Sequence, residues 1–347
     1  CVQCSGQFRI KHPVIARLAG YPDLYLHFNT LAKMNHFISI QDVEDKQALL
    51  HQALSFIESP WQNESRGQRK TLGMLFFNPS LRTRLSTQQA AYQLGMKVIS
   101  MNADQGWKIE FEDGVIMNAD KAEHVREAAA VMSQLVDMIA IRSFPGLVNR
   151  DKDYQEEVMT QFVKFATVPI VNLESSTLHP LQSFADIITL EQHRKASRPK
   201  TKVVLTWAPH IRALPQAVSN SFAQWALGYE YDLVITHPEG YQLNENFTHG
   251  ARIEYDQLAA FEGADFIYAK NWSSYEDYGK VLCTDPDWMI TKEKMTLTNQ
   301  AKFMHCLPTR RNLEIADDVL DSPDSLVVKQ AKNRIFAAQA VLNELLL

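Results

Sequence analysis

The sequence predicts an α/β protein made of two doubly wound domains, each with a central, mainly parallel sheet flanked by helices. Short apolar runs typical of buried strands alternate with amphipathic segments typical of helices. This alternation is typical of parallel strands joined by right-handed helical crossovers. With 347 residues, the chain is long enough for two domains of ordinary size.

The first domain is predicted to span residues 34–194. Residues 36–40 have a strand-like pattern, and the apolar face of residues 42–59 predicts a helix. Gly95 is the predicted residue beyond a helix end, because glycine readily adopts the left-handed conformation found there. Further strands are predicted at 71–77, 97–101, 137–142 and 168–173, and further helices at 82–94, 122–134 and 181–193.

The second domain is predicted to span residues 195–333. It begins with a polar, basic joint at 195–202 that contains Pro199. The amphipathic helix predicted at 334–347 is expected to pack back on the first domain. Between these ends, strands are predicted at 203–207, 232–236, 265–269 and 303–307, and helices at 217–227 and 255–261.

Residues 1–33 differ from the rest of the chain. They do not begin with Met, and they lack the apolar core of a signal peptide. A regular domain opening follows directly after Met34. We expect Met34 to be the natural start and residues 1–33 to be a non-native or disordered extension; a poorly ordered native arm is the alternative.

The composition excludes several classes of partner and site. A formal charge of −5 gives no field that would attract nucleic acid or an anionic membrane. No apolar run approaches the roughly 18 residues of a membrane span. Four cysteines in so long a chain do not form a disulfide framework, and the lone Cys1-x-x-Cys4 spacing is typical of chance. We therefore expect a cytoplasmic protein with no metal site.

The segment from Phe77 to Arg84 has the features of an anion site. It follows a predicted buried strand and opens a helix, where unpaired N–H groups and the helix dipole favour negative charge. Ser80 and Thr83 add hydroxyl groups, and Arg82 adds a planar guanidinium that suits phosphate. An ordinary helix cap with two solvated arginines is the alternative. Neither P-loop nor GxGxxG spacing is present, so a nucleotide is not implied.

Polar residues also follow two neighbouring strands. Arg142 ends one of them and can reach the same crevice, although a surface arginine is the alternative. His179 and Gln182 lie at a loop-to-helix junction after the next strand, where imidazole and carboxamide can bind a small carbonyl-amide group. An ordinary loop is the alternative. Glu174 lies at the same edge, where it could simply be a solvated or capping acid.

The segment from His305 to Arg311 follows the last predicted strand. Its terminal carbonyl groups are expected to point into the crevice. Cys306 could be a nucleophile, but no partner His–Asp pair is recognisable from the spacing, so a thiol that lines a pocket is the preferred interpretation.

Three separated motifs together are similar to one family. Residues 80–84 (Ser-Leu-Arg-Thr-Arg), 179–182 (His-Pro-Leu-Gln) and 305–308 (His-Cys-Leu-Pro) occur in this order. In this combination the chain resembles the aspartate and ornithine carbamoyltransferase superfamily over roughly residues 34–347. The third motif resembles the ornithine side of the superfamily.

Further motifs resemble the branch of that superfamily that acts on N-acylated ornithine. They are residues 105–108, 207–210, 268–272 and 307–312. The Ser-Met-Gly loop of enzymes that hold free ornithine is not found after Lys270. Acetyl-type enzymes carry Glu where this chain has Ala122, and succinyl-type enzymes usually carry Pro. Ala122 removes a charge that would repel a succinyl carboxylate, and Arg212 matches an arginine of the succinyl type.

The resemblance implies a role for each motif residue. Arg82, His179 and Cys306 would be catalytic, and a neighbouring subunit of a homotrimer would contribute Trp107. The carbamoyl phosphate site would comprise Ser80, Leu81, Arg82, Thr83, Trp107, Arg142, His179, Gln182, Cys306, Leu307 and Arg334. The acylornithine site would comprise Glu174, His210, Arg212, Lys270, Arg310 and Ala122. A backbone knot in the second domain is also implied.

The expected reaction follows from the resemblance. The δ-amine of N-succinylornithine would attack the carbamoyl carbon of carbamoyl phosphate, with no cofactor, in a step toward arginine. N-acetylornithine is the nearest alternative substrate. Three more distant hypotheses are a transferase for free ornithine, a catalytically silent binding protein and a nucleotide-binding α/β protein.

Overall fold

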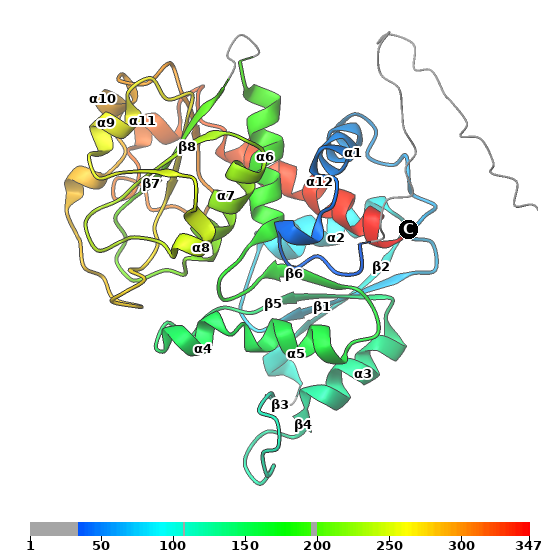
Figure 1. Ribbon diagram of the computed structural model, residues 1–347. Coiled ribbons are helices and arrows are strands. Elements are labelled where there is room, and N and C mark those ends of the chain that lie inside the picture. The colour runs from blue at the N-terminus through cyan, green and yellow to red at the C-terminus, as the bar shows by residue number, and fades with distance from the viewer. Residues whose placement is uncertain (1–33, 107, 196–199) are drawn as a thin grey trace, which may run out of the picture. The chain divides into compact units, whose positions relative to one another are not determined.

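The computed structural model describes residues 34–106, 108–195 and 200–347 (Figure 1). The predicted extension at 1–33 and residues 196–199 of the predicted joint lie outside the described residues. Two parallel sheets organise the described part of the chain, and a short third pair, β3 (Ile109–Glu110) with β4 (Glu123–His124), is also parallel. The predicted α/β class with parallel sheets is confirmed.

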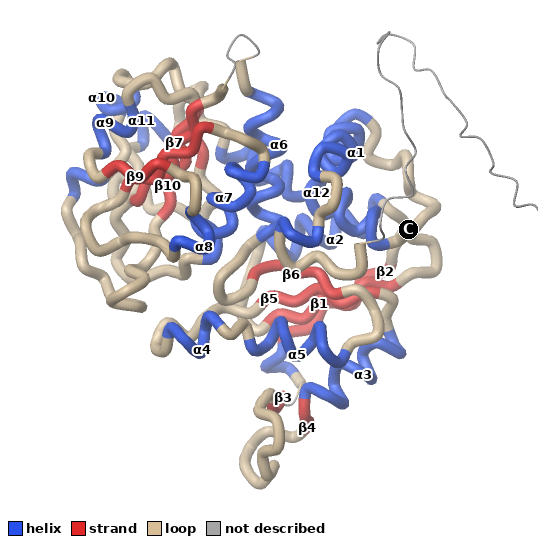
Figure 2. Tube along the Cα trace, viewed as in Figure 1, coloured by secondary structure: helices blue, strands red, loops and turns tan. Residues whose placement is uncertain are grey.

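The first sheet has the order β2-β1-β5-β6. Its strands are β1 (Thr71–Phe76), β2 (Lys97–Asn102), β5 (Met138–Arg142) and β6 (Ile170–Glu174). Helices cover both faces, with α1, α2, α6 and α12 on one side and α3 and α5 on the other (Figure 2). The bounds of the helices in this part are α1 (Lys46–Glu58), α2 (Arg82–Gln93), α3 (Val125–Leu135), α4 (Arg150–Tyr154), α5 (Glu157–Phe165), α6 (Pro180–His193) and α12 (Val327–Leu345).

The second sheet has the order β11-β10-β7-β8-β9. Its strands are β7 (Lys202–Trp207), β8 (Asp232–Thr236), β9 (Arg252–Glu254), β10 (Phe266–Lys270) and β11 (Lys302–Met304). Its helices are α7 (Ala217–Gly228), α8 (Glu245–Thr248), α9 (Gln257–Phe261), α10 (Lys292–Met295) and α11 (Asp317–Leu320). Three 3-10 turns complete the described elements: η1 (Ile40–Asp42), η2 (Ala103–Gln105) and η3 (Pro286–Trp288).

In each large sheet the order in which strands are added reverses once, and ligands of such folds bind beside the point of reversal. In the first sheet the chain runs from β1 to β2 on one side and later to β5 on the other. In the second sheet it runs from β7 to β8 on one side and later to β10 on the other. Ligands of open parallel sheets bind at the carboxyl ends of the strands beside such switch points.

Helix α6 is buried along almost its whole length, from Pro180 to Leu190. It packs against α12 and α7, and therefore has neighbours from both parts of the chain. A helix that is apolar on all sides is expected to be buried in this way. Asp186 and Gln182 also lie in this helix and are buried, so the hydrogen bonds of their polar groups come from inside the protein.

Several predicted elements need correction. The strand-like pattern at 36–40 does not form a strand: Phe37 makes a single bridge to Val171, and Ser39 then caps the turn η1. The C-terminal helix begins at Val327 rather than at residue 334. Helices α4 and α5 were not predicted. By contrast, Gly95 has the predicted left-handed φ of 80° directly after α2.

Among the described residues, no helix combines the length and apolar character needed to cross a membrane.

Candidate active site

The carboxyl ends of three neighbouring strands bring the first group of predicted residues together. Phe76 is in register with Arg142, and Arg142 is in register with Glu174 after a register shift between β5 and β6. Both charged side chains are only 6% exposed. The alternative of a solvated surface arginine at position 142 is therefore wrong.

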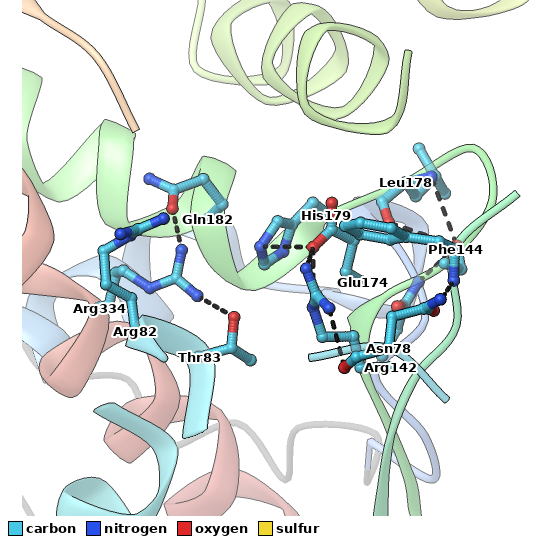
Figure 3. Close-up of polar contacts among 12 residues, drawn as sticks. Asn78, Arg82, Thr83, Arg142, Phe144, Glu174, Leu178, His179, Gln182 and Arg334 are labelled. Atoms are coloured by element: carbon cyan, nitrogen blue, oxygen red, sulfur yellow. Dashed lines mark hydrogen bonds and ion pairs between the residues drawn. The ribbon is translucent and has the colours of Figure 1, made fainter. Parts of the chain in front are cut away.

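Arg142 connects this edge of the sheet through several contacts (Figure 3). Its Nε donates to Glu174 Oε2 over 3.1 Å, and its Nη1 donates to the carbonyl oxygens of Asn78 and Pro79. The side chain of Asn78 in turn accepts from the backbone N–H of Phe144 over 2.6 Å. The loop that leads into α2 is thus held by a buried ion pair.

The N-terminus of α2 is open to a ligand. Leu81 is the residue before the helix, and its apolar side chain makes no capping hydrogen bond to the first backbone N–H groups. Thr83 is buried in the first turn, and Ser80 lies just before the helix, so both hydroxyls lie at this helix start. A twelve-residue helix with uncapped N–H groups favours an anion at this end.

Arg334 of α12 completes this corner, although 251 residues separate it from Thr83. Its guanidinium donates to Thr83 Oγ1 over 2.6 Å and to the amide oxygen of Gln182 (Figure 3). Arg82 donates to the carbonyl oxygen of Leu307 over 2.6 Å. Segments 80–84, 179–182 and 305–308 therefore meet, as their common assignment to one site predicted.

His179 precedes α6 and is only 3% exposed. Its Nε2 lies 3.6 Å from Glu174 Oε2. Burial, followed by the positive charges of Arg334, Arg142 and Arg82, holds the pKa of the His179 imidazole well below its usual range. The imidazole is therefore neutral near pH 7 and can offer one donor and one acceptor.

The second sheet contributes Lys270 and the segment after β11. Lys270 is 8% exposed at the end of β10. Burial raises the pKa of the Cys306 thiol, so the thiol is protonated near pH 7. The interpretation of Cys306 as a thiolate nucleophile is thus disfavoured. Leu307 has a φ of 55° and precedes the cis bond to Pro308, and its carbonyl oxygen accepts from Arg82.

A second cluster surrounds His210. Arg310 Nε donates to His210 Nε2 over 3.1 Å, so Nε2 is an acceptor. His210 Nδ1 lies 2.9 Å from the carbonyl oxygen of Arg212 and 3.2 Å from its backbone nitrogen. Since Arg310 donates to Nε2, a ring proton on Nδ1 that is donated to the shorter contact, the carbonyl oxygen, fits best. Glu314 is 2% exposed and has carboxylate oxygens 3.9 Å from His210 Nε2 and 3.2 Å from His305 Nε2.

Some predicted residues are not brought into these contacts. Ala122 lies beside β4, and its backbone N–H donates to the Lys108 carbonyl oxygen over 3.0 Å. Figure 1 shows the β3–β4 pair on the opposite side of the first sheet from α6. The side chain of Arg212 is exposed, and its hydrogen bonds with His210 are through the backbone. Arg84 points to Ser100 and Asn102 of β2. Trp107 lies outside the described residues.

Three buried residues at the site escaped the sequence-based prediction. Asp186 accepts hydrogen bonds from Gln182 and Gln330, each over 2.7 Å, and Glu314 joins the histidine cluster. A carboxylate one helical turn after Gln182, followed by the apolar pair Ile187 and Ile188, was a usable signal for Asp186. Glu314 and Gln330 show no comparable pattern in the sequence.

The site as a whole is a local concentration of positive charge in a chain of net charge −5. Arg82, Arg142 and Arg334 all act on His179, and Lys270 acts on Cys306. Two buried atoms here, His179 Nδ1 and Arg334 Nε, have no hydrogen-bond partner within the described part of the chain. This arrangement can bind a compact anion and stabilise negative charge that develops beside it.

Comparison with known proteins supports this chemistry. Residues 35–192 match the family model described as "Aspartate/ornithine carbamoyltransferase, carbamoyl-P binding domain". Residues 215–345 match the model described as "Aspartate/ornithine carbamoyltransferase, Asp/Orn binding domain".

Individual relatives are similar over most of their length. An N-succinylornithine carbamoyltransferase of Bacteroides thetaiotaomicron is 51% identical over 316 residues, which are 90% of this chain and 99% of the relative. An N-acetylornithine carbamoyltransferase of Xanthomonas campestris is 34% identical, covering 89% of this chain and 97% of the relative. A solved N-acetyl-L-ornithine transcarbamylase variant, with one glutamate replaced by proline, is complexed with carbamyl phosphate and N-succinyl-L-norvaline. It matches with a TM-score of 0.84 at 33% identity, covering 89% of this chain and 99% of that one.

Proposed function

The chain belongs to the aspartate/ornithine carbamoyltransferase family, and we propose that it transfers the carbamoyl group of carbamoyl phosphate to the δ-amine of N-succinylornithine. One observation carries the proposal: Thr83, Gln182 and Arg334, from three distant segments, are joined by hydrogen bonds at an uncapped helix N-terminus. The family membership gives this anion site its substrate. The products are N-succinylcitrulline and phosphate.

The phosphate of carbamoyl phosphate is proposed to bind at the start of α2. Ser80, Leu81, Arg82 and Thr83 would hold it through backbone N–H groups, hydroxyls and a guanidinium. Arg142 and Arg334 would add charge; Trp107 would come from a neighbouring subunit, as the family resemblance implies.

The carbamoyl group is proposed to lie between His179 and Gln182. Burial holds the pKa of the His179 imidazole well below its usual range, so the ring is neutral near pH 7. Its one ring N–H can donate to the carbamoyl oxygen. The amide oxygen of Gln182 can accept from the carbamoyl NH2. Backbone carbonyl oxygens of Cys306 and Leu307 would accept from the same NH2 and from the attacking amine.

The chemical step balances without a covalent enzyme intermediate. The neutral δ-amine attacks the carbamoyl carbon, and a C–N bond forms. The tetrahedral oxyanion is stabilised by Arg82, Thr83 and His179. The bond from the carbonyl carbon to the bridging oxygen then breaks, and the departing phosphate takes the amine proton. Positioning and preorganised charge are the protein's main contribution.

The acylornithine is proposed to bind along Glu174, His210, Lys270 and Arg310. A preference for succinyl over acetyl is proposed to come from Ala122 and Arg212. Arg212 is exposed and can supply a cation for the succinyl carboxylate. Ala122 takes the place where acetyl-type enzymes carry a glutamate. The relative at 51% identity and the solved variant that has lost a glutamate and carries N-succinyl-L-norvaline support this assignment.

We further propose a cytoplasmic homotrimer that acts in arginine biosynthesis and whose second domain contains the family's knot. Exposed apolar side chains along the β2 edge favour self-association. Leu81, Leu85 and Tyr92 lie along α2 and are 58–70% exposed, and Ile99 and Met101 lie on the edge strand at 48% and 36%. Residues 34–194, with the C-terminal helix, are the proposed carbamoyl phosphate domain, and 195–333 the proposed acylornithine domain.

Product analysis tests the proposal. The purified protein is incubated with carbamoyl phosphate and N-succinylornithine. Mass spectrometry then measures the mass gain of the acylornithine, which is about 43 Da when a carbamoyl group replaces one hydrogen atom. We expect N-succinylcitrulline and equimolar phosphate. Tight binding of carbamoyl phosphate without any ureido product would instead identify a catalytically silent binding protein.

A further inference from the structure

Asp186 is a buried carboxylate that the reaction described above does not use. It is fully buried on α6, one helical turn after Gln182. Its Oδ1 accepts from Gln182 Nε2 and from Gln330 Nε2 of α12, each over 2.7 Å. Its Oδ2 has no hydrogen-bond partner within the described residues, so the two glutamine amides are the hydrogen-bond contacts through which we expect it to act.

An ionised carboxylate can only accept hydrogen bonds. Both glutamines must therefore turn their NH2 groups toward Asp186 and their oxygens away from it. The oxygen of Gln182 then faces Arg334, which also donates to Thr83. The oxygen of Gln330 accepts from the backbone N–H of His305 over 2.9 Å, just after β11. One carboxylate thus fixes the orientation of an amide on each side of the crevice.

We propose that Asp186 is a positioning residue that locks the Gln182 amide with its oxygen toward the carbamoyl group, and the Gln330 amide with its oxygen toward the His305 backbone. The inference rests on the proposed function. A carbamoyl NH2 needs an acceptor, and the reversed Gln182 amide would present a donor instead. Leaving two donors face to face in a buried site is costly, so the orientation matters for binding.

Other groups around Asp186 leave its charge state sensitive to pH. The Tyr268 hydroxyl of β10, the Cys306 thiol after β11 and Arg334 of α12 surround it together with the two glutamines. Burial raises the pKa of Asp186 to about 7, and the two glutamines and Tyr268 oppose this rise. A protonated Asp186 can donate, so the orientation of the amides is less firmly set below that pH.

The test measures carbamoyl phosphate binding by calorimetry in wild type, Asp186→Asn, Gln182→Ala and the double variant. Asparagine keeps the shape but can turn its own NH2 toward the glutamines. We expect Asp186→Asn to weaken binding about 10-fold, the usual effect of losing one hydrogen bond to a charged group. In the Gln182→Ala background the same change should cost less than about twofold, because positioning through Gln182 makes the two effects non-additive.

Thr189→Val is the matched control. Thr189 lies one turn further along α6 and is fully buried. Its hydroxyl oxygen accepts a hydrogen bond from the side-chain amide of Asn333 in α12 over 2.9 Å. It contacts neither glutamine in the described hydrogen bonds, so its loss should lower the melting temperature without weakening carbamoyl phosphate binding. At pH 8, Asp186→Asn should weaken carbamoyl phosphate binding without lowering the melting temperature, because it removes a buried charge. A merely structural role for Asp186 would lower the melting temperature and leave binding unchanged.

The wild-type protein offers a readout that needs no folded variant at position 186. The side-chain amide NMR signals of Gln182 and Gln330 should shift together with a midpoint near the pKa of Asp186, about 7. Additive costs in the double-variant cycle, or amide signals that do not shift between pH 6 and 8, would overturn the proposal. If wild type itself neither binds carbamoyl phosphate nor forms a ureido product, the proposed function falls and this inference falls with it.

Discussion

Arg334 joins the two halves of the proposed carbamoyl phosphate site. Its guanidinium donates in two directions, to Thr83 and to Gln182, while the side chain is only 6% exposed. Lysine would keep the charge but not the planar fork that makes both contacts. We expect Arg334→Lys to lower kcat/KM for carbamoyl phosphate by roughly 10- to 100-fold, the loss of one charged hydrogen bond. Steady-state kinetics at saturating N-succinylornithine measure this change.

Arg311→Lys is the matched control for that variant. Arg311 is exposed and pairs with Asp317 and Asp321. Exposed pairs contribute little, so its kinetics should stay near those of wild type. Equal effects of the two substitutions would mean that the geometry of Arg334 is not important for the site.

His179 gives a pH prediction with a defined sign. Burial and three arginines lower the pKa of its imidazole, whereas the unfolded chain protonates it near the ordinary value of about 6.5. Below that pH the unfolded chain therefore binds more protons than the folded protein. As a result, His179 lowers the free energy of unfolding as the pH falls through about 6.5. Its ring signal, assigned with His179→Gln, should stay in the neutral position in NMR spectra from pH 8 to 5.5. A titration with a midpoint near 6.5 would contradict the neutral donor proposed here.

The sequence placed most site residues at strand ends but could not show their partners. Arg142 could be interpreted as a surface arginine, because its ion pair with Glu174 depends on the register of β5 and β6. The contact of Arg334 with Thr83 joins residues far apart in the chain, and no local pattern indicates it. Glu314 was missed for the same reason. Family resemblance supplied the roles that strand-end position alone left open.

Apolar runs in the sequence predicted the strands well and the connecting segments poorly. All four strands of the first sheet and four of the five in the second were expected close to their observed bounds. The exception, β9 (Arg252–Glu254), is a short edge strand without a buried apolar run. Helix α4 was missed because its five residues carry no apolar stripe. Helix α5 was missed although Val158, Met159 and Phe162 have helical spacing, so a usable signal was overlooked there. The start of α12 was misplaced because exposed Val328 and buried Gln330 obscure its first turns.

The junction between α4 and α5 fixes the loop that leads to His179. Glu156 has left-handed backbone angles (φ 52°, ψ 42°), and its carboxylate accepts from Ser175, Ser176 and Thr177. Removing it takes the acceptor from donors of the buried residues Ser175 and Thr177. We expect Glu156→Ala to reduce the free energy of unfolding by about 1–3 kcal/mol and to lower kcat as the loop loosens. Urea denaturation and steady-state kinetics measure the two effects.

Glu157→Ala is the control at the neighbouring position. Glu157 lies in the first turn of α5, where a carboxylate adds only a modest dipole interaction. Its loss should cost no more than about 1 kcal/mol and leave kcat unchanged. If both variants unfold at the same urea concentration, the Glu156 contacts do not hold the loop.

The proposed homotrimer predicts that each active site contains residues from two subunits. Arg82→Ala and Trp107→Ala should each be nearly inactive alone. Mixed and reassembled, they should regain activity, because some sites then combine an intact Arg82 with an intact Trp107 from the neighbour. Random reassembly of a cyclic trimer would restore about a quarter of the sites. No recovery after verified subunit exchange would place Trp107 outside the neighbouring site.

We propose that this carbamoyltransferase acts on an ornithine whose α-amine carries a succinyl group. The most direct measurement is the ratio of kcat/KM for N-succinylornithine to kcat/KM for N-acetylornithine, with the purified protein and saturating carbamoyl phosphate. We predict a ratio well above one, on the order of 100 for a charged pair formed with one substrate only. A ratio below one, with N-acetylcitrulline as the preferred product, would contradict the claim.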